Sequence, residues 1–267
     1  MKIPRSLFGA VLVTAFAAAA FAQQTPSGFH SVACIKVKPQ DRVEFRKFTA
    51  DTVHKLEQAR ANSGAITAWY MMRSVIPQGR SAECDFLSIV IYAGATPTTF
   101  SREQTEATLK EIGSSMTAQE LNARRDTLTS LVSNNLFRTR ASVGEIKKGD
   151  YIVVHYQKVP NTRDWLANEV KVWQPFAGEM LKDGVRTGWS AIVQVMPTGS
   201  DLKYNAVNVD VYPSLEAVFK SDPQMQDRWK KVHPDMDFAT TMQGLDKFRT
   251  TVFQGMFTVE DMVAKAK

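Results

Sequence analysis

NSGAITAWYMMRSVIPQGRSAECDFLSIVIY, residues 62–92, and KDGVRTGWSAIVQVMPTGSDLKYNAVNVDVY, residues 182–212, are two versions of one segment. At a shift of 120 positions, seven residues are identical, including the V-x-P-x-G phrase that begins at Val75 and at Val195. A repeat of this period indicates a duplicated domain rather than a solenoid. The sequence therefore predicts two tandem copies of one folding unit.

Each copy carries the same order of secondary-structure signals around this segment. A strand is predicted first, then an amphipathic helix that ends at Gly64 or Gly184, then two strands joined by the proline-glycine turn. A helical region and a short last strand complete each copy. The predicted strands are 29–37, 66–76, 85–92 and 136–143 in the first copy and 151–159, 186–196, 204–212 and 252–259 in the second, with helical regions at 101–132 and 215–247.

The order βαββαβ is that of a ferredoxin-like unit, so the sequence predicts an α+β protein with repeats at 28–146 and 147–267. A four-stranded sheet with helices on one face leaves its other face to be covered. Two such units in one chain resemble the dimeric α+β barrel superfamily, which includes NIPSNAP-type proteins, antibiotic-biosynthesis-type monooxygenases and haem proteins related to chlorite dismutase. The resemblance implies two antiparallel sheets packed face to face around a pocket, as a pseudo-dimer within one chain.

The N-terminus is typical of a secretory signal peptide. Lys2 and Arg5 precede an apolar run from Leu7 to Phe21, and Ala20-Phe21-Ala22 forms an A-x-A cleavage site. We therefore expect residues 1–22 to be removed, a short tail at 23–27, and a periplasmic or secreted protein without a membrane anchor. The alternative that the sequence leaves open is an uncleaved anchor.

Charge and motifs exclude several classes of function. Removal of Lys2 and Arg5 would lower the formal net charge from +6 to +4, and the basic pairs are dispersed, so no nucleic-acid partner is expected. The chain carries no glycine-rich nucleotide loop, no G-x-S-x-G and no H-E-x-x-H. Nucleotide cofactors, serine hydrolysis and zinc proteolysis are therefore disfavoured.

Alternation along the strands predicts which side chains enter the space between the sheets. In the second copy, Val207, Val209 and Val211 are expected to face the helices, as are Ile152, Val154 and Tyr156, and the polar residues between them to face inward. The predicted ligand-binding residues are Tyr151, His155, Arg186, Ser190, Gln194, Tyr204, Asn208, Asp210 and Tyr212. The equivalent inward set of the first copy is more apolar: His30, Val32, Cys34, Tyr70, Met72, Ser74, Phe86, Ser88, Val90 and Tyr92.

Among these residues, His155 and Asp210 are the candidates for catalysis. We expect them to lie close together on neighbouring strands, where the imidazole can orient a ligand or take a proton. The alternatives left open are a solvent-facing Asp210 and an interior His155 bonded only to nearby backbone.

The sequence also raises a hypothesis for His233 and an open question about the two cysteines. His233 lies four residues after Trp229 on a predicted helix, and the resemblance to haem-binding members suggests it as a haem ligand, against the alternative of a histidine that ends a helix before Pro234. No other cofactor and no metal site is predicted. Cys34 and Cys84 are the only cysteines, and the sequence leaves open whether they form a disulfide.

These patterns favour an exported protein that binds a small organic ligand between its sheets. A cofactor-independent monooxygenase or a haem enzyme is the alternative in the enzyme class. A structural or interaction protein without a pocket is the third reading. The sequence decides neither the ligand nor whether the protein is a monomer or a homo-oligomer.

Overall fold

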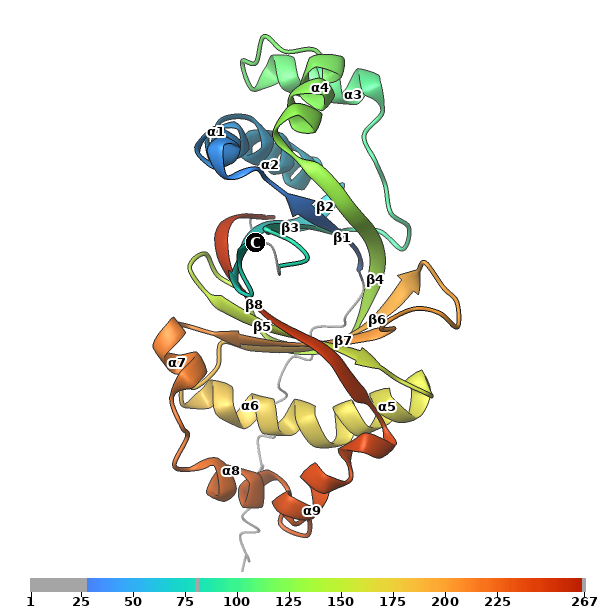
Figure 1. Ribbon diagram of the computed structural model, residues 1–267, viewed down its shortest axis with the longest axis vertical. Coiled ribbons are helices and arrows are strands. Elements are labelled where there is room, and N and C mark those ends of the chain that lie inside the picture. The colour runs from blue at the N-terminus through green and yellow to red at the C-terminus, as the bar shows by residue number, and fades with distance from the viewer. Residues whose placement is uncertain (1–27, 80–81, 266–267) are drawn as a thin grey trace, which may run out of the picture.

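The computed structural model describes residues 28–79 and 82–265. The predicted signal peptide and the tail at 23–27 lie outside these residues. The described chain forms a mixed α+β fold: a closed antiparallel barrel with helices packed on its outside (Figure 1). In the described part of the chain, no helix is both long and apolar enough to cross a membrane.

Eight strands form the barrel in the described residues. They follow one another around it in the order β1-β3-β2-β8-β5-β7-β6-β4, and β4 pairs with β1 to close the ring. Their bounds are β1 Phe29–Lys36, β2 Ile66–Ile76, β3 Phe86–Tyr92, β4 Ser130–Gly144, β5 Tyr151–Lys158, β6 Gly188–Met196, β7 Ala206–Tyr212 and β8 Thr250–Ala264.

Two long strands join the halves of the barrel. The 15-residue β4 pairs with β1 through its first part and with β6 through its second, and the 15-residue β8 pairs likewise with β5 and β2. The last strands are thus longer than the short ones expected from the sequence. Because each covers the open edge of the other half, the two sheets of the expected pseudo-dimeric α+β barrel also meet edge to edge and form one closed ring.

The helices lie on the two opposite sides of the barrel. On one side are α1 (Arg42–Phe48), α2 (His54–Asn62), α3 (Arg102–Glu111) and α4 (Ala118–Leu128). On the other are α5 (Thr162–Asn168), α6 (Gln174–Lys182), α7 (Leu215–Phe219), α8 (Met225–Val232) and α9 (Phe238–Gln243) (Figure 1).

The shift of 120 recurs in these elements. It relates α1 to α5, α2 to α6, β3 to β7 and β4 to β8, and a single π-helical turn joins the helices in both halves, at Thr49–Val53 and Glu169–Trp173. As predicted, α2 and α6 end just before Gly64 and Gly184, whose positive φ angles of 79° and 70° stop a helix at little cost.

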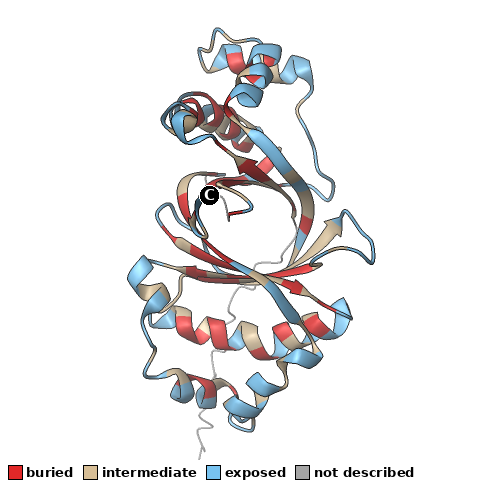
Figure 2. Ribbon diagram, viewed as in Figure 1, coloured by how far each residue is buried: buried red, intermediate tan, exposed pale blue. Residues whose placement is uncertain are grey.

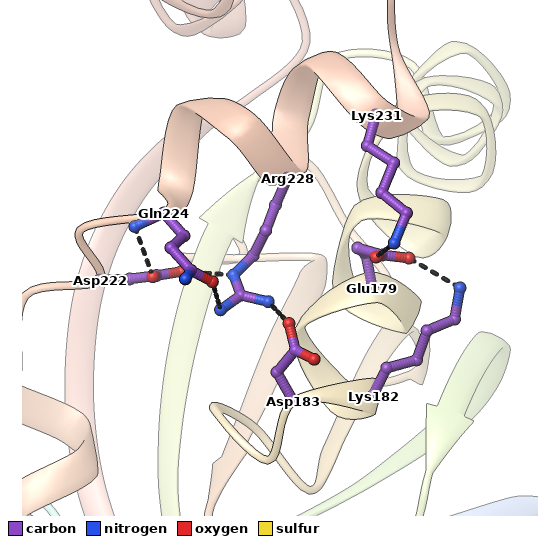
Figure 3. A network of polar contacts seen from close by, with 7 residues as sticks. All are labelled: Glu179, Lys182, Asp183, Asp222, Gln224, Arg228 and Lys231. Atoms are coloured by element: carbon purple, nitrogen blue, oxygen red, sulfur yellow. Dashed lines mark hydrogen bonds and ion pairs between the residues drawn. The ribbon is translucent and has the colours of Figure 1, made fainter.

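Buried residues form an apolar layer inside the barrel and further layers under the helices (Figure 2). Ion pairs connect α6 and α8, the outer helices of the second half (Figure 3). Glu179 on α6 pairs with Lys182 and with Lys231 of α8, and Arg228 of α8 pairs with Asp183 and Asp222. These contacts hold α8 against α6.

Candidate functional site

The barrel encloses a cavity of about 920 Å³, which we call the barrel cavity. Its wall is mainly aliphatic and comes from both halves of the chain, with Ile89 and Ile91 on β3 and Val207 and Val209 on β7. This volume lies within the range of sites for small organic molecules.

His30 is a buried polar side chain of this wall. Thr139 donates its backbone N–H to Nε2 of His30 at 2.9 Å, and its hydroxyl oxygen lies 2.6 Å from the same nitrogen. Since Nε2 accepts a hydrogen bond, the proton of the neutral ring is on Nδ1. Burial lowers the pKa of His30 to about 4, so the ring is neutral at physiological pH.

Two phenols add polar atoms to the cavity. Burial raises the pKa of Tyr70, and the negative charge of Glu145 raises it further. Burial also raises the pKa of Tyr156, whose ring packs 4.7 Å from that of Tyr204. Both hydroxyl groups therefore keep their protons and can donate.

Charge is confined to the end of the cavity where β1 and β2 begin and β4 and β8 end. Glu145 and Lys265 are the charged residues among those that line the cavity in the described part of the chain. Both directly follow long strands, Glu145 after β4 and Lys265 after β8. The deeper wall is uncharged.

Strand alternation assigned some of the barrel interior correctly. His30, Val32, Tyr70 and Met72 line the cavity as predicted, and so does Ser190 on β6. Tyr204 packs with the same apolar cluster, and its hydroxyl accepts a hydrogen bond from Asn135 at 3.3 Å.

The predicted orientations of β3, β5 and β7 are wrong. Ile152, Val154 and Tyr156 line the cavity together with Val207 and Val209, although the sequence placed all five against the helices. On β3, Phe86 packs on Phe45 of α1, so Phe86, Ser88 and Val90 face outward. The prediction assumed that the more apolar face of each strand packs against the helices. In a closed barrel the inner face is enclosed on every side, so the more apolar face lies there instead.

His155 and Asp210 lie close together as predicted, but on the outer face of the barrel. Nε2 of His155 is 3.1 Å from Oδ2 of Asp210, and Arg186 forms an ion pair with the same carboxylate. The Arg186 guanidinium lies 5.4 Å from the ring centroid of Tyr212. Burial opposes ionisation of Asp210, but Arg186 and His155 outweigh it and lower the pKa of this carboxyl.

Asn208 belongs to a second buried network beneath the helices. Its side-chain amide donates to Glu169 in the π-helical turn at 3.0 Å, and Arg249 bonds to both Glu169 and Asn208. Glu169 is fully buried, and this burial, only partly offset by Arg249 and Asn208, raises its pKa to about 7. The network fastens the helix to the sheet.

Two more predicted residues lie away from the barrel cavity. Tyr151 shares the outward face of β5 with His155. Gln194 lies near the end of β6, where its amide donates to the carbonyl of Pro197 at 3.0 Å.

His233 does not fit the role of a haem ligand. Its Nε2 donates to the backbone carbonyl of Val172 at 2.8 Å, and its ring packs on that of Trp229 at 4.6 Å. The residue is buried between α8 and the helix beneath it, outside the barrel. His233 is instead a structural histidine at the end of a helix, which is the alternative that the sequence left open.

Cys34 and Cys84 form a disulfide in the structure. Cys34 lies on β1 with its side chain toward the barrel interior, and Cys84 precedes β3, the neighbour of β1. The bridge therefore links two adjacent strands near one end of the barrel.

A second cavity, of about 830 Å³, lies between the outer face of the first-half strands and helices α1, α2 and α4. We call it the sheet–helix cavity. At several positions of its wall, the residue 120 positions later in the chain is larger. These pairs include Phe45 and Trp165, Thr49 and Glu169, Val53 and Trp173, Leu56 and Phe176, Ser88 and Asn208, and Thr129 and Arg249. At these positions the second half carries more side-chain volume than the first. The Oγ1 atom of Thr49 is buried beside the sheet–helix cavity without a hydrogen-bond partner.

A third pocket, of about 560 Å³, lies beside His54 of α2. Nδ1 of His54 lies 3.0 Å from Asp261 on β8. The carboxylate fixes the ring, which leaves Nε2 as the available nitrogen. Among the described residues, no group of three or more His, Cys, Asp or Glu side chains is arranged to hold a metal ion.

Sequence reasoning did not single out His30 as a functional residue. It placed His30 correctly inside the barrel but set that copy aside because its interior is apolar. The signal that identifies it is a lone histidine among inward-facing aliphatic residues, since such a ring is desolvated and must be held by neighbouring donors.

No protein-family model and no curated protein sequence matches the chain. Solved structures do resemble it. A "putative monooxygenase" from Lactobacillus acidophilus superposes with a TM-score of 0.54 over 90% of this chain and 97% of its own, at 8% identity. A "putative monooxygenase" from Fusobacterium nucleatum gives the same TM-score and identity and covers 90% of this chain and 95% of its own. At this identity the likeness concerns the fold alone, and with the closed eight-stranded ring it identifies the chain as having the dimeric α+β barrel fold.

Proposed function

We propose that this protein binds a small, largely apolar organic molecule inside its barrel. The observation that carries the proposal is the barrel cavity, about 920 Å³ in volume and lined by aliphatic side chains with a few polar groups. Ligand sites combine such apolar walls with a small number of polar atoms that fix orientation. A cavity of this size also argues against a structural protein whose sheets are packed shut.

Export is part of this proposal. The N-terminal sequence has the three regions of a signal peptide, and the disulfide between Cys34 and Cys84 suits an oxidising compartment. N-terminal sequencing of the protein recovered from the periplasm or medium should find Gln23 first. An intact Met1 would contradict cleavage.

Native mass spectrometry of protein purified from its own periplasm or medium is the direct test of ligand binding. A retained ligand should appear as added mass that is lost on denaturation. Ala68 lines the cavity, so Ala68→Phe should reduce the bound fraction by filling the space. Ala123→Phe, at an exposed position on α4, is the matched control and should retain the ligand.

A monooxygenase-type reaction in the sheet–helix cavity is the second candidate function. It is favoured by the unpartnered Thr49 hydroxyl and by Glu57, a carboxyl of the same wall whose pKa burial raises against the opposing charge of Arg60. A carboxylate of raised pKa is better suited to take a proton from an acidic substrate. The two structural relatives described as monooxygenases make this reaction worth testing.

Oxygen uptake in the presence of acidic phenols would test this second candidate, with Glu57→Gln as the inactive variant. A Soret band in freshly purified protein would instead indicate haem. Because the Nε2 atom of His233 is already bonded, that haem would need another ligand.

A further inference from the structure

We propose that the ligand of the barrel cavity is an uncharged molecule with a carbonyl-type acceptor, and that the Nδ1–H group of His30 donates to this acceptor. The inference rests on the function proposed above and names the chemical class that the cavity selects. It starts from the hydrogen bonds of His30.

Thr139 fixes which nitrogen of His30 carries the proton. A backbone N–H can only donate, so its 2.9 Å contact requires a lone pair on Nε2. The neutral ring then presents Nδ1–H, for which the described residues supply no hydrogen-bond acceptor. His30 is 7% exposed and lines the cavity. An acceptor on the ligand can therefore pair with this donor, and a neutral hydrogen bond of this kind contributes about 1 kcal/mol.

The charges around the cavity favour an uncharged ligand. Lys265 is the cation of the lining in the described residues, and it lies just after the end of β8, at the cavity's charged end. For a cation, Glu145 is the acidic residue of the described lining, and it lies at that same end. His30, the second residue of β1, lies at this same end, where Lys265 and Glu145 carry opposite charges. An ion of either sign would meet a like charge there as well as an unlike one, so the lining does not offset the loss of its hydration.

Two phenols of the lining can donate as well. Tyr70 on β2 and Tyr156 on β5 both line the cavity, and no described residue bonds to either hydroxyl. Their pKa values are raised, so both keep their protons. An uncharged ligand that carries hydrogen-bond acceptors can pair with these donors, whereas a hydrocarbon cannot.

Three probes of one shape test the proposal on the mature, disulfide-bonded protein by equilibrium dialysis. They are 2-acetylnaphthalene, 2-ethylnaphthalene and 2-naphthoate: a ketone, a hydrocarbon and an anion. We expect the ketone to bind about tenfold more tightly than the hydrocarbon, as one neutral hydrogen bond in a dry site provides. The anion should bind most weakly. Ala68→Phe should weaken all binding, which assigns the probes to the barrel cavity.

His30→Phe keeps an aromatic ring and removes both nitrogens. The affinity for the ketone should fall to that for the hydrocarbon, with the hydrocarbon unchanged. Ser88→Ala, on the outer face of β3, is the control and should preserve the preference. If His30→Phe does not fold, the infrared carbonyl stretch of the ketone bound to the wild-type protein replaces it, and it should lie below its position in hexane.

The outcomes separate the two proposals. If no probe binds, the ligand-binding function itself fails. If ketone and hydrocarbon bind equally, if 2-naphthoate binds most tightly, or if the carbonyl stretch is unshifted, the cavity remains a ligand site but the role of His30 is overturned.

Discussion

Nε2 of His155 lies 3.1 Å from Oδ2 of Asp210, and the pair sits on the outer face of β5 and β7, the face that α5 and α6 cover. With Arg186 on the same carboxylate, the three side chains form a charged cluster outside the barrel. Its role in the structure is to tie neighbouring elements together.

Asp210→Asn should lower the free energy of unfolding by about 3 kcal/mol at pH 7, because it breaks a largely buried ion pair. The pKa of Asp210 is lowered in the folded protein, so this stabilisation is complete above the ordinary value of 3.8 and is lost as the pH falls through the folded pKa. Urea unfolding at pH 7 and pH 3 measures it. Asp235→Asn, at an exposed position, should change neither value, and an Asp210→Asn protein as stable as the wild type would contradict the structural role.

Glu169 gives the opposite pH dependence. Its pKa is about 7 in the folded protein against an ordinary 4.5, so the folded state loses stability as the pH rises between these values. Glu169→Gln should remove this loss, and its stability relative to the wild type should increase by about 3 kcal/mol between pH 5 and pH 8. Chemical denaturation at both pH values is the measurement. The exposed Glu103→Gln should show no such change, and a constant difference for Glu169→Gln would show that the carboxylate is already ionised at pH 5.

Reduction of the Cys34–Cys84 bridge should destabilise the protein by about 4 kcal/mol. The bridge joins residues 50 positions apart, and a cross-link of that span restricts the unfolded chain by roughly this amount. Urea unfolding with and without dithiothreitol gives the difference. The Cys34→Ser, Cys84→Ser double variant should be as unstable as the reduced protein and insensitive to dithiothreitol. Two free thiols in exported protein would contradict the pairing.

Thr49→Val should stabilise the protein by about 1 kcal/mol. The change replaces a buried hydroxyl that has no hydrogen-bond partner with a methyl group of similar size. Thr108→Val is the matched control, because its buried hydroxyl donates to the carbonyl of Gln104 at 2.8 Å and the same change should destabilise. Thermal unfolding measures both. A destabilised Thr49→Val would show that the hydroxyl has a partner in solution.

The isolated fragment 144–267 should self-associate. In the full chain β6 pairs with β4 and β8 pairs with β2, so the fragment exposes two strand edges and the apolar inner face of its sheet. Sedimentation of the fragment is the test. A well-behaved monomer would refute the requirement for the first half.

The amino-acid sequence determined the repeat and most of its elements. The V-x-P-x-G phrases at Val75 and Val195 gave the shift of 120, and Gly64 and Gly184 gave the helix ends, because these signals are local and act within one turn of chain. The sequence also predicted the strand with strict alternation in each half, β3 and β7. It did not predict which face of that strand points into the barrel.

Only the tertiary structure decided which face of each strand points into the barrel, because both faces are buried. The valines of β7 alternate with Asn208 and Asp210, and either set suits a covered surface: the valines in a dry barrel, the polar residues against Glu169, Arg249 and Arg186. Those partners come from distant parts of the chain, so alternation alone cannot choose between the faces. The same long-range closure, β4 on β6 and β8 on β2, turned the apolar strands into the wall of a cavity and placed His30 within it.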